Sequence, residues 1–314
     1  MTKWRVLITC PQMQVGLDEY RTVFAEQGIE VDTPTVVQQL SEADLAGIID
    51  RYDGMIAGDD PLTASVLERA QRLRVISKWG VGIDNIDLEA ARSRSIRVTN
   101  TPGAFGDEVA DVVVGYLVLL ARGLHQIDAR VRAGEWPKIE GASLAGKTLG
   151  IVGLGSIGRA LATRAGALGL LLLGHDVSEN QRVASEALGV QTVPLGELLR
   201  QADFVSLNCP LTANNHHMLG EREFRLMKRG ARLINTARGQ LVDEGELVQA
   251  LEEGRLAGAA LDVFEVEPLP LTSRLRSFSQ VILGAHNGSN TSEAVRRVSD
   301  MAVQNLIEGL KDEG

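Results

Sequence analysis

The chain has 314 residues, with 41 Asp and Glu against 32 Lys and Arg, and a formal net charge of −9. This acidic balance argues against nucleic acid or an anionic membrane as the main partner, because either would need a basic face. The length exceeds what one core usually supports, so two domains are expected. Neither a run of about 20 apolar residues nor a secretory signal pattern is found, which predicts a cytoplasmic protein.

Cysteines and histidines give no sign of a metal site. Cys10 and Cys209 are far apart and have no CxxC or Cys/His ligand spacing, which suits a reducing compartment. The pair His216 and His217 is the one suggestive pattern, but adjacent side chains diverge on a helix or strand and no third ligand is apparent. The sequence therefore predicts no metal.

The first hundred residues alternate short apolar runs with helical patterns. The apolar runs are 6–9, 54–57, 75–77 and 96–99, and helical patterns cover 42–49 and 64–72. This rhythm predicts a parallel sheet covered by helices. A long amphipathic segment, 107–133, then predicts one helix that joins two domains. Its apolar side is wide, which leaves two interpretations open: burial within its own chain, or contact with a second subunit.

The most informative feature is a glycine turn that follows the apolar run 149–152. Gly153 permits a tight turn, Gly155 lets backbone N–H groups approach phosphates, and Gly158 lets the next helix, 156–168, pack closely. Ser156 and Ile157 are the first residues of that helix. Their backbone N–H groups lie at the helix N-terminus, where a pyrophosphate can bind. The turn predicts a dinucleotide site.

An acidic residue follows the next predicted strand. The apolar run 170–173 ends near Asp176, about 18 residues after Gly158, where a ribose-binding acid belongs. A carboxylate there would repel a 2′-phosphate, so NAD is predicted over NADP, although Arg182 lies near enough to leave NADP open.

Further apolar runs complete a second sheet. They cover 204–207, 233–235, 259–261 and 281–283, and a helical pattern over 292–310 follows the last of them. This final helix could return to the first domain. Three polar side chains lie just past the later runs, namely Arg238, Glu267 and His286. Because open α/β sheets form their ligand crevice at the carboxyl ends of the strands, we expect these three to converge on one small molecule.

These motifs together resemble the NAD-dependent D-2-hydroxyacid dehydrogenases, and most closely their phosphoglycerate dehydrogenase-like branch. The resemblance covers nearly the whole chain. It rests on the glycine turn with Asp176, the segment 227–243 around Asn-Thr-Ala-Arg-Gly, the segment 260–268, and His286. Residues 78–87 and 100–102 are similar to the family's substrate loop.

The resemblance implies a fold and a domain plan. We expect an α/β protein of two doubly wound parallel-sheet domains, in which a Rossmann NAD-binding domain is inserted into a flavodoxin-like substrate domain. The predicted boundaries are 1–103 for the first part of the substrate domain, 104–286 for the dinucleotide-binding domain, and 287–314 for the returning helix. A homodimer is implied too, paired through the long helix and the arm around Trp136.

Hydride transfer between the nicotinamide and C2 of a D-2-hydroxy acid or 2-keto acid is the implied reaction. Arg238 would hold the substrate carboxylate and the reacting oxygen. His286 would donate a proton to that oxygen during reduction and remove it during oxidation. Such general acid–base catalysis typically raises the reaction rate about 10²–10⁴-fold. Glu267 would orient the imidazole and favour its protonated form.

The resemblance assigns the remaining positions by their role. Backbone N–H groups of the substrate loop would bind the substrate carboxylate at Gly80, Val81 and Gly82. The cofactor would be held at its nicotinamide carboxamide by Asp262 and the backbone near Ala237, and at its adenine by Pro210 and Thr212.

Departures from the family pattern bear on the substrate. The family commonly has an arginine in the substrate loop where this chain has Lys78-Trp79, its usual proline before the histidine is Ala285 here, and residues 287–291 are unusually polar. One hypothesis is that Lys78, with Asn287, Ser289 or Asn290, binds a second anionic group on the substrate, such as a phosphate or carboxylate. The alternative is that Lys78 only caps a strand.

Three functions remain open on the sequence. The first, which leads, is a D-2-hydroxyacid dehydrogenase that acts mainly as a ketoacid reductase or as a 3-phosphoglycerate dehydrogenase, with 3-phosphoglycerate or another substrate bearing a second anionic group as one option. The second is a glyoxylate or hydroxypyruvate reductase, which has no use for Lys78. The third is an NAD-sensing binding protein similar to transcriptional corepressors. The chain ends at Gly314 soon after the final helix, so control by serine through an added regulatory domain is not expected.

Overall fold

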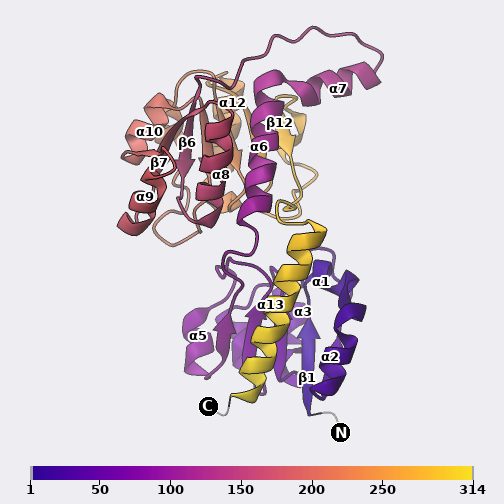
Figure 1. Ribbon diagram of the computed structural model, residues 1–314. Helices are drawn as coiled ribbons and strands as arrows, with labels where there is room; N and C mark the ends of the chain where they lie inside the picture. Colours follow the sequence, from indigo (N-terminus) through magenta and orange to yellow (C-terminus); the bar gives the residue numbers. More distant parts are fainter. Residues whose placement is uncertain (1–2, 313–314) are drawn as a thin grey trace. The chain divides into compact units, whose positions relative to one another are not determined.

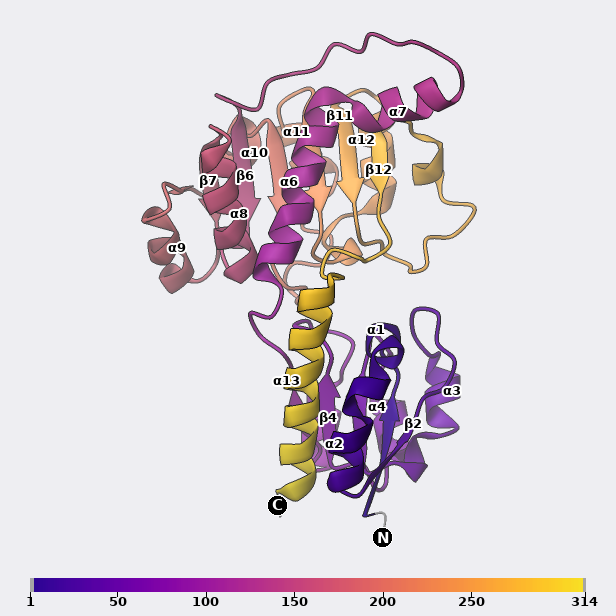
Figure 2. The same cartoon turned by 45° about the vertical axis from the view of Figure 1, so that its right-hand side comes forward.

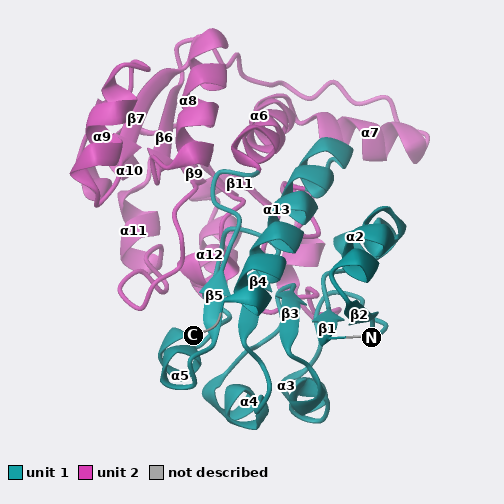
Figure 3. Ribbon diagram, turned by 60° about the horizontal axis from the view of Figure 1, so that its bottom comes forward, with its two compact units in different colours: residues 1–104, 290–314 teal, residues 105–289 magenta. Residues whose placement is uncertain are grey.

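The computed structural model describes residues 3–312, which divide into two compact units (Figure 3). Unit 1 consists of residues 1–104 and 290–314, and unit 2 of residues 105–289. The expected domain boundaries follow residues 103 and 286, whereas the two units divide after residues 104 and 289. Each unit is built on its own parallel sheet, as the sequence predicts for the fold class.

Unit 1 has a five-stranded sheet in the order β2-β1-β3-β4-β5, all parallel, which is the flavodoxin-like order. Its strands are β1 (Trp4–Ile8), β2 (Ile29–Asp32), β3 (Gly54–Ala57), β4 (Val75–Lys78) and β5 (Arg97–Thr99). Its α-helices are α1 (Pro11–Val15), α2 (Arg21–Glu26), α3 (Glu42–Ala46), α4 (Ala64–Arg69), α5 (Leu88–Ser93) and α13 (Ser292–Lys311), with 3₁₀ turns η1 (Leu17–Tyr20) and η2 (Ile49–Arg51).

The C-terminal helix α13 belongs to unit 1, where it runs beside β4 (Figure 2). Two glycines permit the close approach: a Cβ on Gly54 would lie 2.8 Å from Leu306 Cδ1, and one on Gly309 would overlap Val75. Ser77 Oγ on β4 donates to Ala302 O at 2.9 Å. The predicted return of the chain to its first domain is therefore made by a helix packed on the centre of the sheet.

Unit 2 has a seven-stranded parallel sheet in the order β12-β11-β10-β9-β6-β7-β8. Its strands are β6 (Thr148–Val152), β7 (Leu171–His175), β8 (Gln191–Thr192), β9 (Phe204–Leu207), β10 (Ala231–Asn235), β11 (Leu256–Leu261) and β12 (Val281–Leu283). Its α-helices are α6 (Gly106–Arg122), α7 (Leu124–Arg132), α8 (Ser156–Ala167), α9 (Glu179–Glu186), α10 (Leu195–Gln201), α11 (Glu221–Leu226) and α12 (Glu244–Glu252), with 3₁₀ turns η3 (Gly239–Leu241) and η4 (Arg274–Ser277). The strand order reverses between β6 and β9, where doubly wound sheets bind ligands.

The predicted single helix over 107–133 is wrong, because the chain breaks at Gly123. Gly123 has φ 61°, a left-handed conformation that ends α6, and α7 continues at a bend of 68°. Helix α6 lies beside α8 on one face of the sheet (Figure 1) and buries Val113, Leu117 and Leu120. Helix α7 buries none of its residues.

Among residues 3–312, no single helix is both long and apolar enough to cross a membrane. The bent pair α6 and α7 meets the same requirement of length and composition only when the two helices are taken together.

Candidate active site

The glycine turn joins β6 to α8, and its three glycines have different reasons for being glycine. Gly153 has φ 94°, and a Cβ there would lie 2.6 Å from Asn208 C on the neighbouring strand end. A Cβ on Gly158 would overlap Gly153 O. A Cβ on Gly155 would meet nothing within 4 Å. The fold itself therefore requires Gly153 and Gly158, whereas Gly155 leaves space for something outside the chain.

Helix α8 begins at Ser156 with Gly155 as its N-cap residue. The N–H groups of its first turn, including those of Ser156 and Ile157, have no carbonyl in the preceding turn to bind, so they are available to an anion. Arg159 Nη1 donates to Leu154 O at 2.8 Å and so links helix α8 to the main chain of the turn. The sequence did not single out Arg159, since its charge looks like that of any surface residue.

Asp176 follows β7 and lies against the glycine turn. Its Oδ2 accepts from Leu154 N at 2.7 Å and its Oδ1 from Ser178 N at 2.8 Å. Arg182 Nη1 donates to Asp176 O at 2.8 Å and Val177 O at 3.2 Å. Because Arg182 is bound to the main chain, it offers no ready partner for a 2′-phosphate, and the residues fit NAD.

The loop after β9 carries the predicted adenine-side residues Pro210 and Thr212, both exposed. Asn215 holds this loop: its Oδ1 accepts from Thr212 N at 2.7 Å, and its Nδ2 donates to Pro210 O at 2.8 Å. Asn215 is a second positioning residue that sequence reasoning missed, because an asparagine in a polar loop carries no distinctive spacing.

Arg238 lies in the loop after β10, and Asn235 shapes that loop. Asn235 Oδ1 accepts from Ala237 N at 3.0 Å, and its Nδ2 donates to Arg238 O at 2.8 Å. A Cβ on Gly239 would overlap the Phe264 main chain, so the loop lies directly against the segment that leads to Glu267. Thr236 Oγ1 is buried without a hydrogen-bond partner among the described residues, which fits a site where a ligand supplies one.

His286 and Glu267 are in direct contact. His286 Nδ1 lies 2.8 Å from Glu267 Oε2, and Glu267 Oε1 accepts from Phe264 N at 2.9 Å. Both side chains are largely shielded, with 27% and 19% of their surface exposed. A carboxylate at hydrogen-bond distance favours the charged imidazole, so this pair can hold a proton on His286 Nε2 for delivery to an oxygen. His286 has φ 51°, an uncommon main-chain conformation for a residue with a side chain.

Asp262 is 3% exposed, and both carboxylate oxygens accept backbone N–H groups of the segment after His286. These two hydrogen bonds were not expected, because the family motif assigns Asp262 to the cofactor. Ala237, the other residue assigned to the nicotinamide carboxamide, lies in the Arg238 loop.

Lys78 lies at the end of β4, where its partner in the strand register is Ala57. Its Nζ donates to Gly58 O at 2.6 Å and Asp59 Oδ1 at 2.8 Å, and its side chain is 3% exposed. This is the arrangement of a lysine that closes the end of a strand, which is the alternative left open above. A pocket for a second anion would require the ammonium to leave Asp59. Of the polar residues expected to share that pocket, Asn287 and Ser289 belong to unit 2 and Asn290 to unit 1.

The predicted substrate loop follows Lys78 in unit 1. Gly80 N already donates to Thr101 Oγ1 at 3.2 Å, and Gly80 O accepts from Thr101 N at 3.0 Å. Asn100 Nδ2 donates to Val81 O at 2.7 Å and so orients the next peptide. Of the three backbone donors expected here, those of Val81 and Gly82 are therefore the better placed to bind a carboxylate.

His217 lies between two carboxylates, those of Asp243 and Glu265. Its Nδ1 is 3.6 Å from Asp243 Oδ2 and its Nε2 is 3.0 Å from Glu265 Oε1. Within residues 3–312, no group of three or more His, Cys, Asp and Glu side chains could hold a metal ion. Cys10 and Cys209 are both free thiols.

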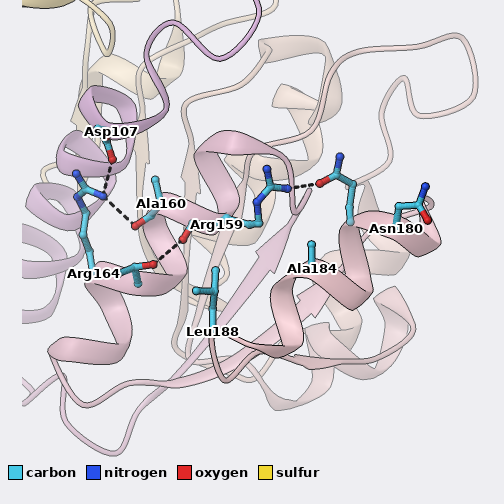
Figure 4. Close-up of a pocket in the computed structure, with 9 residues that line it drawn as sticks. Asp107, Arg159, Ala160, Arg164, Asn180, Ala184 and Leu188 are labelled. Atoms are coloured by element: carbon cyan, nitrogen blue, oxygen red, sulfur yellow. Dashed lines mark hydrogen bonds and ion pairs between the residues drawn. The ribbon is translucent and has the colours of Figure 1, made fainter.

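A groove of about 660 Å³ runs between α8 and α9, on the helix side of the glycine turn (Figure 4). Its two arginines are paired: Arg159 with Gln181, and Arg164 with Asp107 at 3.0 Å and Asp111 at 2.6 Å. Since these guanidinium groups already have acceptors, the groove offers no anion site comparable to the turn itself.

Comparisons with known proteins identify relatives of this chain. The family described as D-isomer specific 2-hydroxyacid dehydrogenase, NAD binding domain, matches residues 114–288. The glyoxylate reductase of Korarchaeum cryptofilum is 44% identical over 254 residues, covering 79% of this chain and 76% of that protein. The D-3-phosphoglycerate dehydrogenase of Methanocaldococcus jannaschii is 37% identical over 313 residues, covering 98% of this chain and 58% of that protein.

One solved structure with a similar fold contains bound ligands. The chain resembles D-lactate dehydrogenase from Aquifex aeolicus, solved with NAD and lactic acid, with a TM-score of 0.83, 29% identity, and coverage of 95% of this chain and 93% of that one.

A doubly wound sheet with a glycine turn, an acidic residue after the second strand of that turn's unit and a histidine–carboxylate pair is typical of an NAD-dependent oxidoreductase. The matches then give the family. The chain belongs to the D-isomer-specific 2-hydroxyacid dehydrogenases, enzymes that act on CH–OH donors with NAD, and the predictions of family, fold, enzyme class and cofactor are confirmed.

Proposed function

We propose that this dehydrogenase acts as a reductase of small 2-keto acids with a single carboxylate, such as glyoxylate and hydroxypyruvate. The observation that carries the proposal is Lys78, whose ammonium is buried and held by Asp59 at 2.8 Å. A substrate with a second anionic group would need a cation that is not already paired. The relationship to a glyoxylate reductase, at 44% identity, supports the same choice.

Three side chains carry the proposed chemistry. Arg238 binds the substrate carboxylate and the reacting carbonyl oxygen through its planar donor fork. His286 donates a proton to that oxygen during reduction and removes it during oxidation. Glu267, 2.8 Å from His286 Nδ1, orients the ring and favours its charged form. The N–H groups of Val81 and Gly82, with Gly80 shaping their loop, bind the carboxylate.

The proposed cofactor contacts follow the geometry of unit 2. The nicotinamide ring of bound NAD supplies or accepts the hydride. The pyrophosphate is held by the first turn of α8, at Gly155, Ser156 and Ile157. Asp176 accepts from the ribose hydroxyls. The exposed loop of Pro210 and Thr212 lines the adenine, while Ala237 and Asp262 lie at the nicotinamide end.

The experiment compares kcat/KM for NADH oxidation with glyoxylate, hydroxypyruvate and 3-phosphohydroxypyruvate. We expect the two unphosphorylated acids to be preferred at least tenfold, which corresponds to about 1.4 kcal/mol. Asp59→Asn is the matched variant, because it removes the charged partner of Lys78. It should raise kcat/KM for 3-phosphohydroxypyruvate and so reduce the preference for the unphosphorylated acids.

A wild-type enzyme that prefers 3-phosphohydroxypyruvate, and loses that preference in Lys78→Ala, would show instead that Lys78 binds a second anion. No turnover of any 2-keto acid would favour the binding-protein alternative.

We further propose a homodimer, in which α7 and the segment after it contact a second copy. No residue of α7 is fully buried, and apolar side chains along this region are exposed, with Leu124 at 41%, Val131 at 40% and Trp136 at 79%. Sedimentation of wild type and Trp136→Ala tests this, and a wild-type monomer would refute it. The free thiols Cys10 and Cys209 support a cytoplasmic location.

A further inference from the structure

Unit 1 has a pocket of about 320 Å³ at the β5 edge of its sheet, where α5 packs beside β5 (Figure 3). Its apolar walls are formed by four residues: Ile83, Leu88, Ile96 and Val98. Arg92 and Asn100 are polar residues of the lining. Binding sites for small molecules are typically apolar cavities of about 300–1,000 Å³ with a few polar groups. The volume and lining of this pocket match that description, and the reaction proposed above uses none of these side chains.

The apolar side of the pocket is incompletely covered by the protein itself. Leu88 begins α5 and is 40% exposed, whereas Ile96, just before β5, is 5% exposed. Removing the remaining apolar surface of Leu88 from water is favourable, and a molecule in the pocket would do so. A ligand for this pocket therefore has an apolar body.

Arg92 gives the pocket a positive charge. It lies in the last turn of α5, and its side chain forms no hydrogen bond or ion pair with any residue of 3–312. By contrast, Arg72 of the same unit is paired with Asp53 at 2.9 Å. A guanidinium binds a carboxylate through two parallel N–H groups, and one guanidinium balances one negative charge. The lining therefore selects a monocarboxylate, since a phosphate dianion requires a second cation.

The pocket shares two residues, Ile83 and Asn100, with the predicted substrate loop. Asn100 Nδ2 donates to Val81 O at 2.7 Å, so Asn100 orients the peptide that carries the N–H of Gly82. Asn100 O in turn accepts from Asn305 Nδ2 of α13 at 3.1 Å. A ligand in contact with Ile83 and Asn100 therefore restricts a peptide to which the proposed function assigns the substrate carboxylate.

We propose that this pocket binds a monocarboxylic acid with a branched or aromatic apolar body, and that the bound acid strengthens substrate binding through Asn100. The carboxylate pairs with Arg92, and the apolar body covers Leu88. The coupling rests on the proposed role of the Gly82 N–H in binding the substrate, whereas the pocket itself does not. Glyoxylate has no apolar body, so it is not the ligand of this pocket.

Methyl NMR of the whole protein during titration with 3-phenylpropionate tests the site directly, because the walls carry Ile, Leu and Val methyl groups. We expect saturable shifts at Leu88, Ile96 and Val98, with a Kd of about 1 mM. 3-Phenylpropionamide has the same shape without the charge and should bind at least tenfold more weakly. If none of these three residues shows a saturable shift, the proposal is overturned.

Arg92→Gln removes the charge and keeps much of the length of the side chain. Its Kd for 3-phenylpropionate should be at least tenfold higher than that of the wild type. Arg94→Gln is the matched control, because Arg94 follows the same helix and does not line the pocket, and its Kd should stay within about twofold of the wild type. Equal affinity of Arg92→Gln and the wild type contradicts the proposed carboxylate site.

The active site also binds carboxylates, so a variant must separate the two sites. In Arg238→Gln the shifts at Leu88 and Ile96 should persist. Their loss would mean that the probe acts from the active site, and the proposal would fail. Shifts that follow protein concentration instead of probe concentration would show that a second copy covers the pocket, which also rules the proposal out.

Steady-state kinetics measures the coupling. Saturating 3-phenylpropionate should lower the KM of glyoxylate about fivefold with kcat within about twofold, because an ordered loop binds the substrate more tightly. In Asn100→Ala the KM should no longer respond, although the shift at Leu88 remains. An unchanged or raised KM in the wild type overturns the coupling. If the wild type reduces no 2-keto acid, the proposed function fails, while the methyl titration still decides the pocket.

Discussion

What a single charged residue in this enzyme can bind depends on its partner, which lies on another strand end and is distant in sequence. Lys78 pairs with Asp59, and His286 with Glu267, because neighbouring parallel strands end at the same edge of a sheet. The sequence identified both Lys78 and His286, but not that the ammonium is already paired. Motif spacing names the residue type at a strand end, whereas its partner depends on which strands are neighbours and on their register.

Both thiols lie in surroundings that suppress ionisation. Burial raises the pKa of Cys10 to about 12 and that of Cys209 to about 11, and the charge of Asp176 adds to the effect at Cys209. At pH 8 the Cys209 thiolate should be about two orders of magnitude scarcer than in a free cysteine, so alkylation should slow at least as much.

Iodoacetamide labelling with mass spectrometry, compared between folded and urea-unfolded protein, measures this. Labelling of Cys209 at the same rate in both states would contradict the expected protection.

At the scale of elements, strong apolar periodicity predicted most strands, and the exceptions have physical causes. Strand β2 was missed because it lies at the sheet edge, where Ile29 is buried but Glu30 is exposed, so its sequence does not read as an apolar run. Strand β8 has only two residues. The break between α6 and α7 was missed because a glycine is tolerated within a helix, and only its left-handed conformation ends one.

The glycine turn allows fold and binding to be separated by two equivalent substitutions. Gly158→Ala should lower the free energy of unfolding by about 2 kcal/mol or more, because its Cβ would overlap Gly153 O. Gly155→Ala should change it by less than about 0.5 kcal/mol and yet raise the Kd of NADH roughly tenfold, because its Cβ enters only the space left for the cofactor.

Urea unfolding and NADH fluorescence titration of both variants test this pair. If Gly155→Ala binds NADH with wild-type affinity, the cofactor does not occupy the space beside Gly155, and the expectation is contradicted.

Over the whole molecule, the sequence predicted a division into two parallel-sheet units and the return of the last helix to the first, and the structure has both. The doubly wound order of each sheet followed from alternating strands and helices, since crossovers between parallel strands leave few topologies. The substrate could not be predicted in the same way. On the function proposed above, it depends on whether Lys78 is available, and composition and motifs carry no information on that.

The most direct test of hydride transfer to C2 is reduction of hydroxypyruvate with NADH in which both hydrogens at C4 are replaced by deuterium. The account predicts glycerate of D configuration with deuterium at C2, and almost none from His286→Ala although this variant still binds NADH. Glycerate of L configuration, or D-glycerate without deuterium at C2, would contradict it.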